Sequence, residues 1–403
     1  MLITKPVSEV KEIIQHTFGK VRMGSETVPL LDCLGRVLAE DVIASAYIPN
    51  FDRSGMDGYA VKADDLVGCS ESKPARLRLV GQSQMGEHIK LQIENGQCAY
   101  VPTGGEVPAG TEAVVMIEDT KDLGDGWIGF NKPYQKKTNV IFRGEDMKPG
   151  EVVIPAGKRL KIADTGTLAA MGMVNVPVMV KPKVGIISTG NELVSASESL
   201  KQVGMIRDVN SPMLHHAITA CGCTPIHFGI VKDVREDIVD VIRQAISQCD
   251  LLIISGGTSM DTKDMLTAII GDLGEVILHG ITVKPGKPTI IGTIQGIPVF
   301  GTPGNPVSAY FTFHTFIRPL LCSFQGTQIV DRKVTVPLLR DFTSTDNREE
   351  YVPVILKDGL ADPVIIKSAL ITTISCADGY MVVLRDCFEV KKGTLVDVTF
   401  LDV

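Results

Sequence analysis

The stretch that most constrains the fold is residues 283–309, VKPGKPTIIGTIQGIPVFGTPGNPVSA. Two Lys-Pro turns open it, and an apolar run then doubles back at Gln295-Gly296. A two-residue turn between apolar runs predicts a hairpin. A second turn rich in glycine and proline follows, and Asn305-Pro306 suits the N-cap and first position of a helix. We therefore expect a hairpin, a tight turn and a helix, in that order.

The second turn of this stretch is typical of an anion site. A glycine-containing turn that opens a helix directs backbone N–H groups and the positive helix end at one point. Lys284 and Lys287 add positive charge nearby, and together these features suit a polyanion. The alternative is a tight strand-to-helix connection with two solvated lysines, and this stretch alone leaves both interpretations open.

Composition and charge exclude several classes of protein. The chain has 403 residues, of which 44 % are hydrophobic, and carries a formal net charge of −7. This length suits roughly two to four domains, and the negative charge argues against a nucleic-acid surface. No apolar run approaches the length of a membrane span. The N-terminus lacks the features of a signal peptide, and nine scattered cysteines fit reduced thiols, so we expect a cytoplasmic location.

Strand and helix patterns alternate over residues 181–325. We expect strands at 184–188, 224–231 and 251–255, and helices at 211–222, 234–247, 264–270 and 306–321. This order predicts a doubly wound parallel sheet, which binds its ligand outside the carboxyl ends of its strands.

The rest of the chain is rich in short strands. Residues 51–139 predict a small β domain inserted into an elongated mixed domain, which residues 1–50 and 140–180 form together. Strand patterns within the inserted domain cover residues 77–79, 98–101, 113–117 and 128–130. Residues 326–403 predict a C-terminal β-barrel-like domain.

Polar and glycine-rich loops follow the predicted strands of the α/β region. Their candidate ligand-binding residues are Ser255, Gly256, Gly257, Ser259, Pro303, Gly304, Asn305, Pro306 and Ser308. Glu192, Asp233 and Asp264 lie at the same edge, and carboxylates beside phosphates require a cation, usually Mg²⁺. Taken singly, Asp233 and Asp264 also stand where helix N-caps stand.

Seven segments resemble, in order and spacing, the molybdopterin molybdenumtransferases, the MoeA-type molybdenum insertases that include the E-domain of gephyrin. They are FDRSGMDGYAV, PTGGEVPAGTEAVVMIEDT, FRGEDMKPGE, GIISTGNEL, SGGTS, VKPGKP and GTPGNPVSAY. The resemblance covers essentially the whole chain. It departs from the family pattern at Asn191, Asp261 and Pro353, and at Lys367 and Ala369 on either side of Ser368.

The resemblance implies a homodimer of four-domain subunits, in which the α/β domain is MogA-like. It implies an enzyme that binds adenylylated molybdopterin, takes up molybdate, and uses Mg²⁺ to release AMP and leave the metal on the dithiolene. The active cleft would lie at the subunit interface, with the loops around Asp57 and Thr103 supplied by the other subunit. Other molybdenum cofactor biosynthesis proteins and molybdoenzyme chaperones are further partners that the resemblance leaves open. No nucleic acid or membrane is expected.

Carried over residue by residue, the resemblance assigns catalytic roles to Asp57, Thr103, Glu192, Asp233 and Asp264. The last three would hold Mg²⁺. It assigns ligand binding to Lys284, Lys287, Pro303, Pro306, Arg348 and Ser368. Three alternatives stay open: a paralogue that prefers tungstate, a molybdopterin adenylyltransferase, and a non-catalytic scaffold or carrier of molybdopterin. The inserted β domain argues against the adenylyltransferase, and the retained carboxylates argue against the scaffold.

Overall fold

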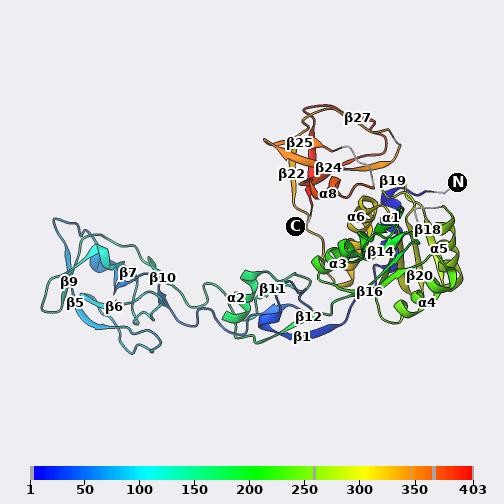
Figure 1. Ribbon diagram of the computed structural model, residues 1–403. Coiled ribbons are helices and arrows are strands. Elements are labelled where there is room, and N and C mark those ends of the chain that lie inside the picture. Colours follow the sequence, from blue (N-terminus) through cyan, green and yellow to red (C-terminus); the bar gives the residue numbers. More distant parts are fainter. Residues whose placement is uncertain (1–3, 257–259, 346, 365–368, 402–403) are drawn as a thin grey trace.

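The chain is elongated, as Figure 1 shows. A β domain forms one end, a narrow segment follows, and an α/β domain with the C-terminal β domain beside it forms the other end. This computed structural model describes residues 4–256, 260–345, 347–364 and 369–401, with the backbone alone for 260–264. Within these residues, no helix combines the length and apolar character needed to cross a membrane.

The α/β domain is built on a six-stranded sheet with the order β16-β13-β17-β21-β20-β18. Its strands are β13 (Lys183–Thr189), β16 (Thr224–Val231), β17 (Leu251–Gly256), β18 (Glu275–His279), β20 (Ile290–Ile294) and β21 (Ile297–Thr302). The first four strands in this order are parallel, as predicted. By contrast, β20 and β18 make antiparallel pairs, because the predicted hairpin reverses the chain. Its turn residues Gln295 and Gly296 have φ values of 52° and 82°, which suit a two-residue hairpin turn.

Helices cover both faces of this sheet. They are α3 (Asn210–Ala220), α4 (Arg235–Ile246), α5 (Met260–Leu273), α6 (Pro306–Thr312), the π-helical η4 (Phe313–Ile317) and α7 (Arg318–Phe324). The predicted start of the last helical segment is confirmed, with Asn305 at the N-cap and Pro306 first in the helix. Two predicted starts were wrong. Helix α4 has Val234, not Asp233, at its N-cap, and α5 begins at Met260, so Asp264 lies within the helix.

Two apolar cores lie on the two faces of the sheet. Along β17, Leu251 and Ile253 belong to the core shared with α3, α6, α7 and the N-terminal helix α1 (Val7–Phe18). Leu252 and Ile254 belong to the core shared with α4 and α5. Successive side chains on a strand point to opposite faces, so a strand covered on both sides is apolar at every position.

The segments before and after the inserted β domain pair with each other. Strand β1 (Ser25–Pro29) lies antiparallel to β12 (Asn175–Met179), and β2 (Val42–Ile43) lies antiparallel to β11 (Val152–Ile154). Helix α2 (Ile162–Ala170) joins the same segment of the molecule. The chain therefore runs out to the β domain and back along one narrow segment (Figure 1).

Short strands build both β domains, as predicted. The inserted domain contains β4 (Gly58–Val61), β5 (Ala75–Gln82), β6 (Gln97–Val101), β7 (Ala113–Met116), β8 (Thr120–Asp122) and β9 (Trp127–Phe130) in one sheet. The C-terminal sheet contains β22 (Lys333–Pro337), β24 (Glu349–Lys357), β25 (Leu360–Pro363), β26 (Gly379–Val383) and β28 (Leu395–Phe400). Its outer strand β19 (Val283–Lys284) comes from the stretch that opens with the Lys-Pro turns, and thus ties this sheet to the α/β domain.

Candidate functional site

The loops after β13 and β16 are bound together at the carboxyl edge of the sheet. The backbone N–H of Gly190 donates to the carbonyl oxygen of Val231 at 3.1 Å. The side-chain oxygen of Asn191 accepts the backbone N–H of Asp233 at 3.2 Å, and Lys232 Nζ donates to the Asn191 carbonyl at 3.0 Å. Asn191 thus holds Asp233 close to the loop that carries Glu192.

Asp233 lies at this edge in surroundings that disfavour its charged form. Its side chain is half-buried, and its Oδ1 has no hydrogen-bond partner among the described residues. Burial raises the pKa of Asp233 and the charge of Glu192 raises it further, while a hydrogen bond from the backbone and the charge of Lys232 oppose the shift. A bound cation would offset both the cost of burying the Asp233 charge and its repulsion by Glu192. The pair therefore fits a hard cation that prefers oxygen ligands.

The third predicted metal ligand, Asp264, cannot be added to this pair, because its side chain lies outside the described residues. Among the side chains that the structure describes, no group of three or more His, Cys, Asp or Glu residues could hold a metal ion. Glu192 and Asp233 are therefore two candidate ligands, and the assignment of all three carboxylates to a metal stays a prediction.

The glycine-rich turn after β17 is shaped by a close backbone approach. A Cβ atom at Gly256 would lie 2.1 Å from Oγ1 and 2.2 Å from the carbonyl oxygen of Thr189, which only glycine permits. Ser255, just before it, is 1 % exposed. Gly257 and Ser259, which were predicted in the same loop, lie outside the described residues.

Asn210 connects this turn to the turn after β21, and sequence reasoning missed it. Its Nδ2 donates to Ser255 Oγ at 2.8 Å and to the Gly304 carbonyl at 2.9 Å. The neighbouring Asp208 accepts the backbone N–H groups of Asn210 and Ser211 at 3.0 and 3.1 Å. The cluster Asp208-Val209-Asn210-Ser211 resembles a helix cap in sequence, and that was the only local signal for these residues.

The turn after β21 brings its predicted residues to the same edge. Pro303, Pro306 and Ser308 are buried, whereas Gly304 and Asn305 are half-buried. In the ladder between β17 and β21, Thr302 stands opposite Ser255. The two glycine-rich turns therefore lie side by side, as an anion site between them requires.

Lys284 pairs with a buried carboxylate, and its predicted role in ligand binding stays a prediction. Its Nζ lies 2.9 Å from Oε1 of Glu350, a residue that is 3 % exposed and accepts a second hydrogen bond from Ser344 Oγ at 2.7 Å. Lys284 thus takes part in an ion pair between the α/β and C-terminal domains, whereas Lys287 is exposed. Arg348 lies at the same junction, where its Nη1 donates to the Val283 carbonyl at 3.4 Å. Ser368 lies outside the described residues.

Asp57 and Thr103 form a separate group in the inserted β domain. Oδ1 of Asp57 accepts the backbone N–H of Thr103 at 2.7 Å, and both residues are exposed. Asp57 directly precedes β4 and Thr103 follows β6, and in Figure 1 β6 lies at the opposite end of the molecule from β16. One chain therefore does not bring all of the predicted residues together at one place.

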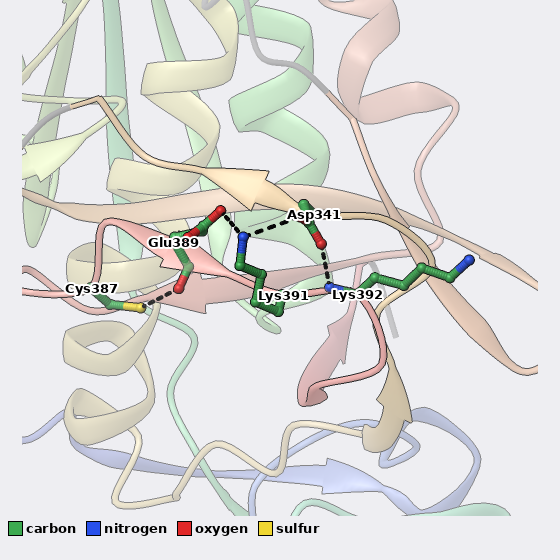
Figure 2. Close-up of polar contacts among 5 residues, drawn as sticks. All are labelled: Asp341, Cys387, Glu389, Lys391 and Lys392. Atoms are coloured by element: carbon green, nitrogen blue, oxygen red, sulfur yellow. Dashed lines mark hydrogen bonds and ion pairs between the residues drawn. The ribbon is translucent and has the colours of Figure 1, made fainter.

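The C-terminal domain also carries a lysine network away from the predicted residues. Figure 2 shows Lys391 paired with Glu389 and, at 3.3 Å, with Asp341, which also accepts the backbone N–H of Lys392 at 2.7 Å. The contact with Glu389 raises the pKa of Lys391 above its ordinary value. Because two carboxylates neutralise this lysine, the network stabilises a turn and does not favour an anion.

A pocket of about 420 Å³ adjoins this network, and no predicted site residue lines it. Its walls are Pro6, Val7, Ser8, Thr282, Glu349, Leu384, Arg385, Asp386 and Cys387. It lies where the start of α1 meets the C-terminal domain, so it is distinct from the edge that carries Glu192 and Asp233. We place the candidate site at that edge, because the glycine turns and the carboxylate pair meet there.

Comparisons with known proteins cover nearly the whole chain. Residues 5–172 match the MoeA N-terminal region (domain I and II), residues 185–322 a probable molybdopterin binding domain, and residues 335–401 the MoeA C-terminal region (domain IV). The chain is 31 % identical to a molybdopterin molybdenumtransferase of Bacillus subtilis, over 98 % of this chain and 94 % of that protein. A molybdopterin molybdenumtransferase of Haemophilus influenzae is 34 % identical, over 75 % of this chain and 73 % of its own length.

Solved structures agree with these matches. The molybdopterin biosynthesis moeA protein from Pyrococcus horikoshii OT3 superposes with a TM-score of 0.86 and 31 % identity, over 99 % of this chain and 100 % of that one. The arrangement of an α/β domain, an inserted β domain and a C-terminal β domain is therefore that of a known multidomain fold.

Proposed function

Because this chain belongs to the MoeA family of molybdopterin molybdenumtransferases, enzymes of molybdenum cofactor biosynthesis, we propose the reaction that it catalyses. It transfers molybdenum from molybdate to adenylylated molybdopterin and releases AMP. The observation that carries this proposal is the pair Glu192 and Asp233 beside two glycine-rich turns, because a phosphoanhydride needs both a cation and N–H donors.

Each group of residues has a distinct task in this proposal. The turns at Gly256 and Gly304 bind phosphate oxygens through their backbone. Glu192 and Asp233, with Asp264 as the third ligand, would hold Mg²⁺. When bound, this ion would neutralise part of the phosphate charge. Molybdate, a substrate and a dianion, suits the junction where Arg348 and the exposed Lys287 lie. The ion pair of Lys284 with Glu350 supports this junction by holding the two domains together.

We infer that the active site is shared between two subunits of a homodimer. The inference is supported by the distance of the Asp57 and Thr103 group from the carboxyl edge within one chain (Figure 1). In a dimer with two-fold symmetry, the β domain of each subunit can reach the α/β domain of the other, and two equal sites result. Such a protein would work in the cytoplasm, where its nine free cysteines stay reduced.

Release of AMP from adenylylated molybdopterin tests the proposed reaction. The purified protein is given Mg²⁺ and increasing molybdate, and then tungstate in a parallel series. We expect release that depends on the oxyanion, with molybdate acting at the lower concentration. A lower requirement for tungstate would identify a tungstate-preferring paralogue. Tight binding without release by either anion would contradict the proposal and indicate a carrier.

A further inference from the structure

Asn210 occupies a position that no predicted role explains. It is the first residue of α3 and is 5 % exposed, between the end of β17 and the turn after β21. Both hydrogen bonds of its carboxamide leave from the same atom, Nδ2, which donates to Ser255 Oγ and to the Gly304 carbonyl. One side chain thus links the two glycine-rich turns.

These contacts determine which way the carboxamide faces. A backbone carbonyl only accepts hydrogen bonds, so the atom 2.9 Å from the Gly304 oxygen is assigned as the NH₂ group. Oδ1 consequently points away from Gly304. It is buried, and within the described part of the chain it has no hydrogen-bond partner.

A second buried polar atom at this edge shares that property. Thr302 is 3 % exposed, stands opposite Ser255 in the sheet, and its Oγ1 also has no partner among the residues described. Buried polar atoms in native proteins are nearly always hydrogen-bonded, because an unpaired one loses its hydration without compensation. Two such atoms, one at the start of α3 and one at the end of β21, indicate a position that a polar ligand completes.

The chemistry of Oδ1 restricts which chemical group of the ligand can bind to it. An amide oxygen accepts hydrogen bonds and cannot donate one, so it repels the oxygens of phosphate or molybdate, which carry no proton to share at neutral pH. Its natural partner is a proton donor, either an N–H or a hydroxyl group. Within the ligand of the proposed function, N–H donors occur on the heterocycles, namely the pterin and the adenine.

We propose that Asn210 is a specificity-determining residue whose Oδ1 accepts a hydrogen bond from the amino group of a heterocycle in the ligand. The inference rests on the proposed function for the class of ligand. It assigns Nδ2 to the positioning of the two turns and Oδ1 to recognition of the ring. The ligand would therefore lie with its ring against α3 and its anionic groups toward the glycine-rich turns.

Binding of ligand pairs that differ by the amino group tests this assignment. Titration calorimetry measures the affinity of the full-length protein for each compound of two pairs. The first pair is AMP and purine riboside 5′-monophosphate, and the second is 6-hydroxymethylpterin and its 2-deaminated analogue. We expect wild-type protein to prefer the amino compound about tenfold in one pair, a typical effect of one hydrogen bond to a buried group. The pair that shows the preference tells whether the pterin or the adenine is the source.

The variant Asn210→Ala should reduce that preference to less than about twofold. A general loosening of the site would weaken both members of a pair equally and leave their ratio unchanged, so the ratio separates recognition from structure. Asn210→Asp keeps an acceptor oxygen and should retain the preference, although overall binding weakens. This second variant keeps the test informative if Asn210→Ala does not fold.

Ser83→Ala is the matched control. Ser83 is 4 % exposed, and its Oγ is also unpaired among the described residues, but it lies in the inserted β domain. Its variant should keep the wild-type ratio. Equal affinity of wild-type protein for both members of both pairs would overturn the inference, as would an unchanged ratio in Asn210→Ala or a lost one in Asn210→Asp. Because binding is measured without molybdate or turnover, failure of the proposed AMP release would be seen separately.

Discussion

Asp57 accepts the backbone N–H of Thr103 at 2.7 Å, although the two residues are 46 positions apart. Neighbouring backbone hydrogen bonds, Ser54 N–H to Gly105 at 2.9 Å and Gly104 N–H to Ser54 at 2.8 Å, hold the same two loops together. The exposed Asp57 and Thr103 thus form one pre-organised surface of the β domain. Such a surface suits a partner that docks against it more than a site within the chain.

Mixing two inactive variants tests the shared active site. Asp57→Asn and Asp233→Asn should each abolish AMP release, because each removes one half of every site in a homodimer. After the two proteins are dissociated together and reassociated, half of the dimers are mixed, and each mixed dimer has one intact site. We expect about a quarter of wild-type activity to return. If the mixture stays inactive although mixed dimers form, both groups must come from the same chain.

Asp233→Asn should also change the metal requirement. If Asp233 is a metal ligand, its loss should weaken Mg²⁺ binding, measured by titration calorimetry, at least tenfold, the scale seen when even an outer partner of a metal ligand is lost. Without Mg²⁺ the variant should be as stable as wild type or more stable, because an unpaired buried oxygen beside Glu192 is replaced. Asp237→Asn, at an exposed position of α4, is the control and should match wild type in a Mg²⁺ titration.

The ion pair between Lys284 and Glu350 should be a strong interdomain contact. Lys284→Ala leaves a carboxylate with 4 % of its side chain exposed without its cation, which typically costs about 3 kcal/mol or more. Urea unfolding measures this loss. The double variant Lys284→Met with Glu350→Gln should recover most of it, because no unpaired charge remains. An unfolding midpoint of Lys284→Ala equal to that of wild type would contradict this account.

Asp164 should make the free energy of unfolding decrease at acidic pH. Burial alone would raise its pKa, but the hydrogen bonds from Lys158 Nζ at 2.6 Å and from the Lys161 N–H at 2.8 Å lower it below 3.8. Because the pKa of Asp164 is lower in the folded state than in the unfolded state, its ionised form stabilises the fold at any pH above the unfolded-state pKa. That stabilisation is lost as the pH falls through the folded-state pKa. Asp164→Asn should therefore cost about 1–2 kcal/mol at pH 7 and progressively less below pH 3.8. A cost that stays constant between pH 7 and pH 3 would show that the charge of Asp164 does not matter.

Gly256→Ala should damage the site directly. The new Cβ would lie 2.1 Å from Thr189 Oγ1, so the paired ends of β17 and β13 must separate. We expect a loss of roughly 1–3 kcal/mol in the free energy of unfolding and a large loss of AMP release. In Gly271→Ala, the nearest atom to the new Cβ is 3.9 Å away, on Val276. This control lies within α5 and should gain up to about 1 kcal/mol in thermal or urea unfolding.

Much of the fold was predictable from local pattern. Strand β16 has the predicted bounds, Thr224–Val231, and the hairpin at Gln295-Gly296 and the helix start at Asn305-Pro306 were also predicted correctly. These features depend on residues that are neighbours in sequence, through side-chain periodicity, turn conformation and the missing N–H of proline. The roles of Glu192 and Asp233 were predicted from their place at the carboxyl edge and from the family resemblance, and they stay predictions. The structure adds that burial and the charge of Glu192 raise the pKa of Asp233.

Contacts between distant residues were decided only by the tertiary structure. By itself, the sequence determined the order of strands and helices and the loops that reach the carboxyl edge. It left Asp233 as a helix cap or a ligand, treated Lys284 as a cation for a ligand, and did not indicate Asn210. Packing decided the surroundings of these residues, because it buries Asp233 beside Glu192 and brings Glu350 to Lys284. A local pattern reports the backbone around a residue, whereas its partner and its exposure depend on which distant segments the fold places against it.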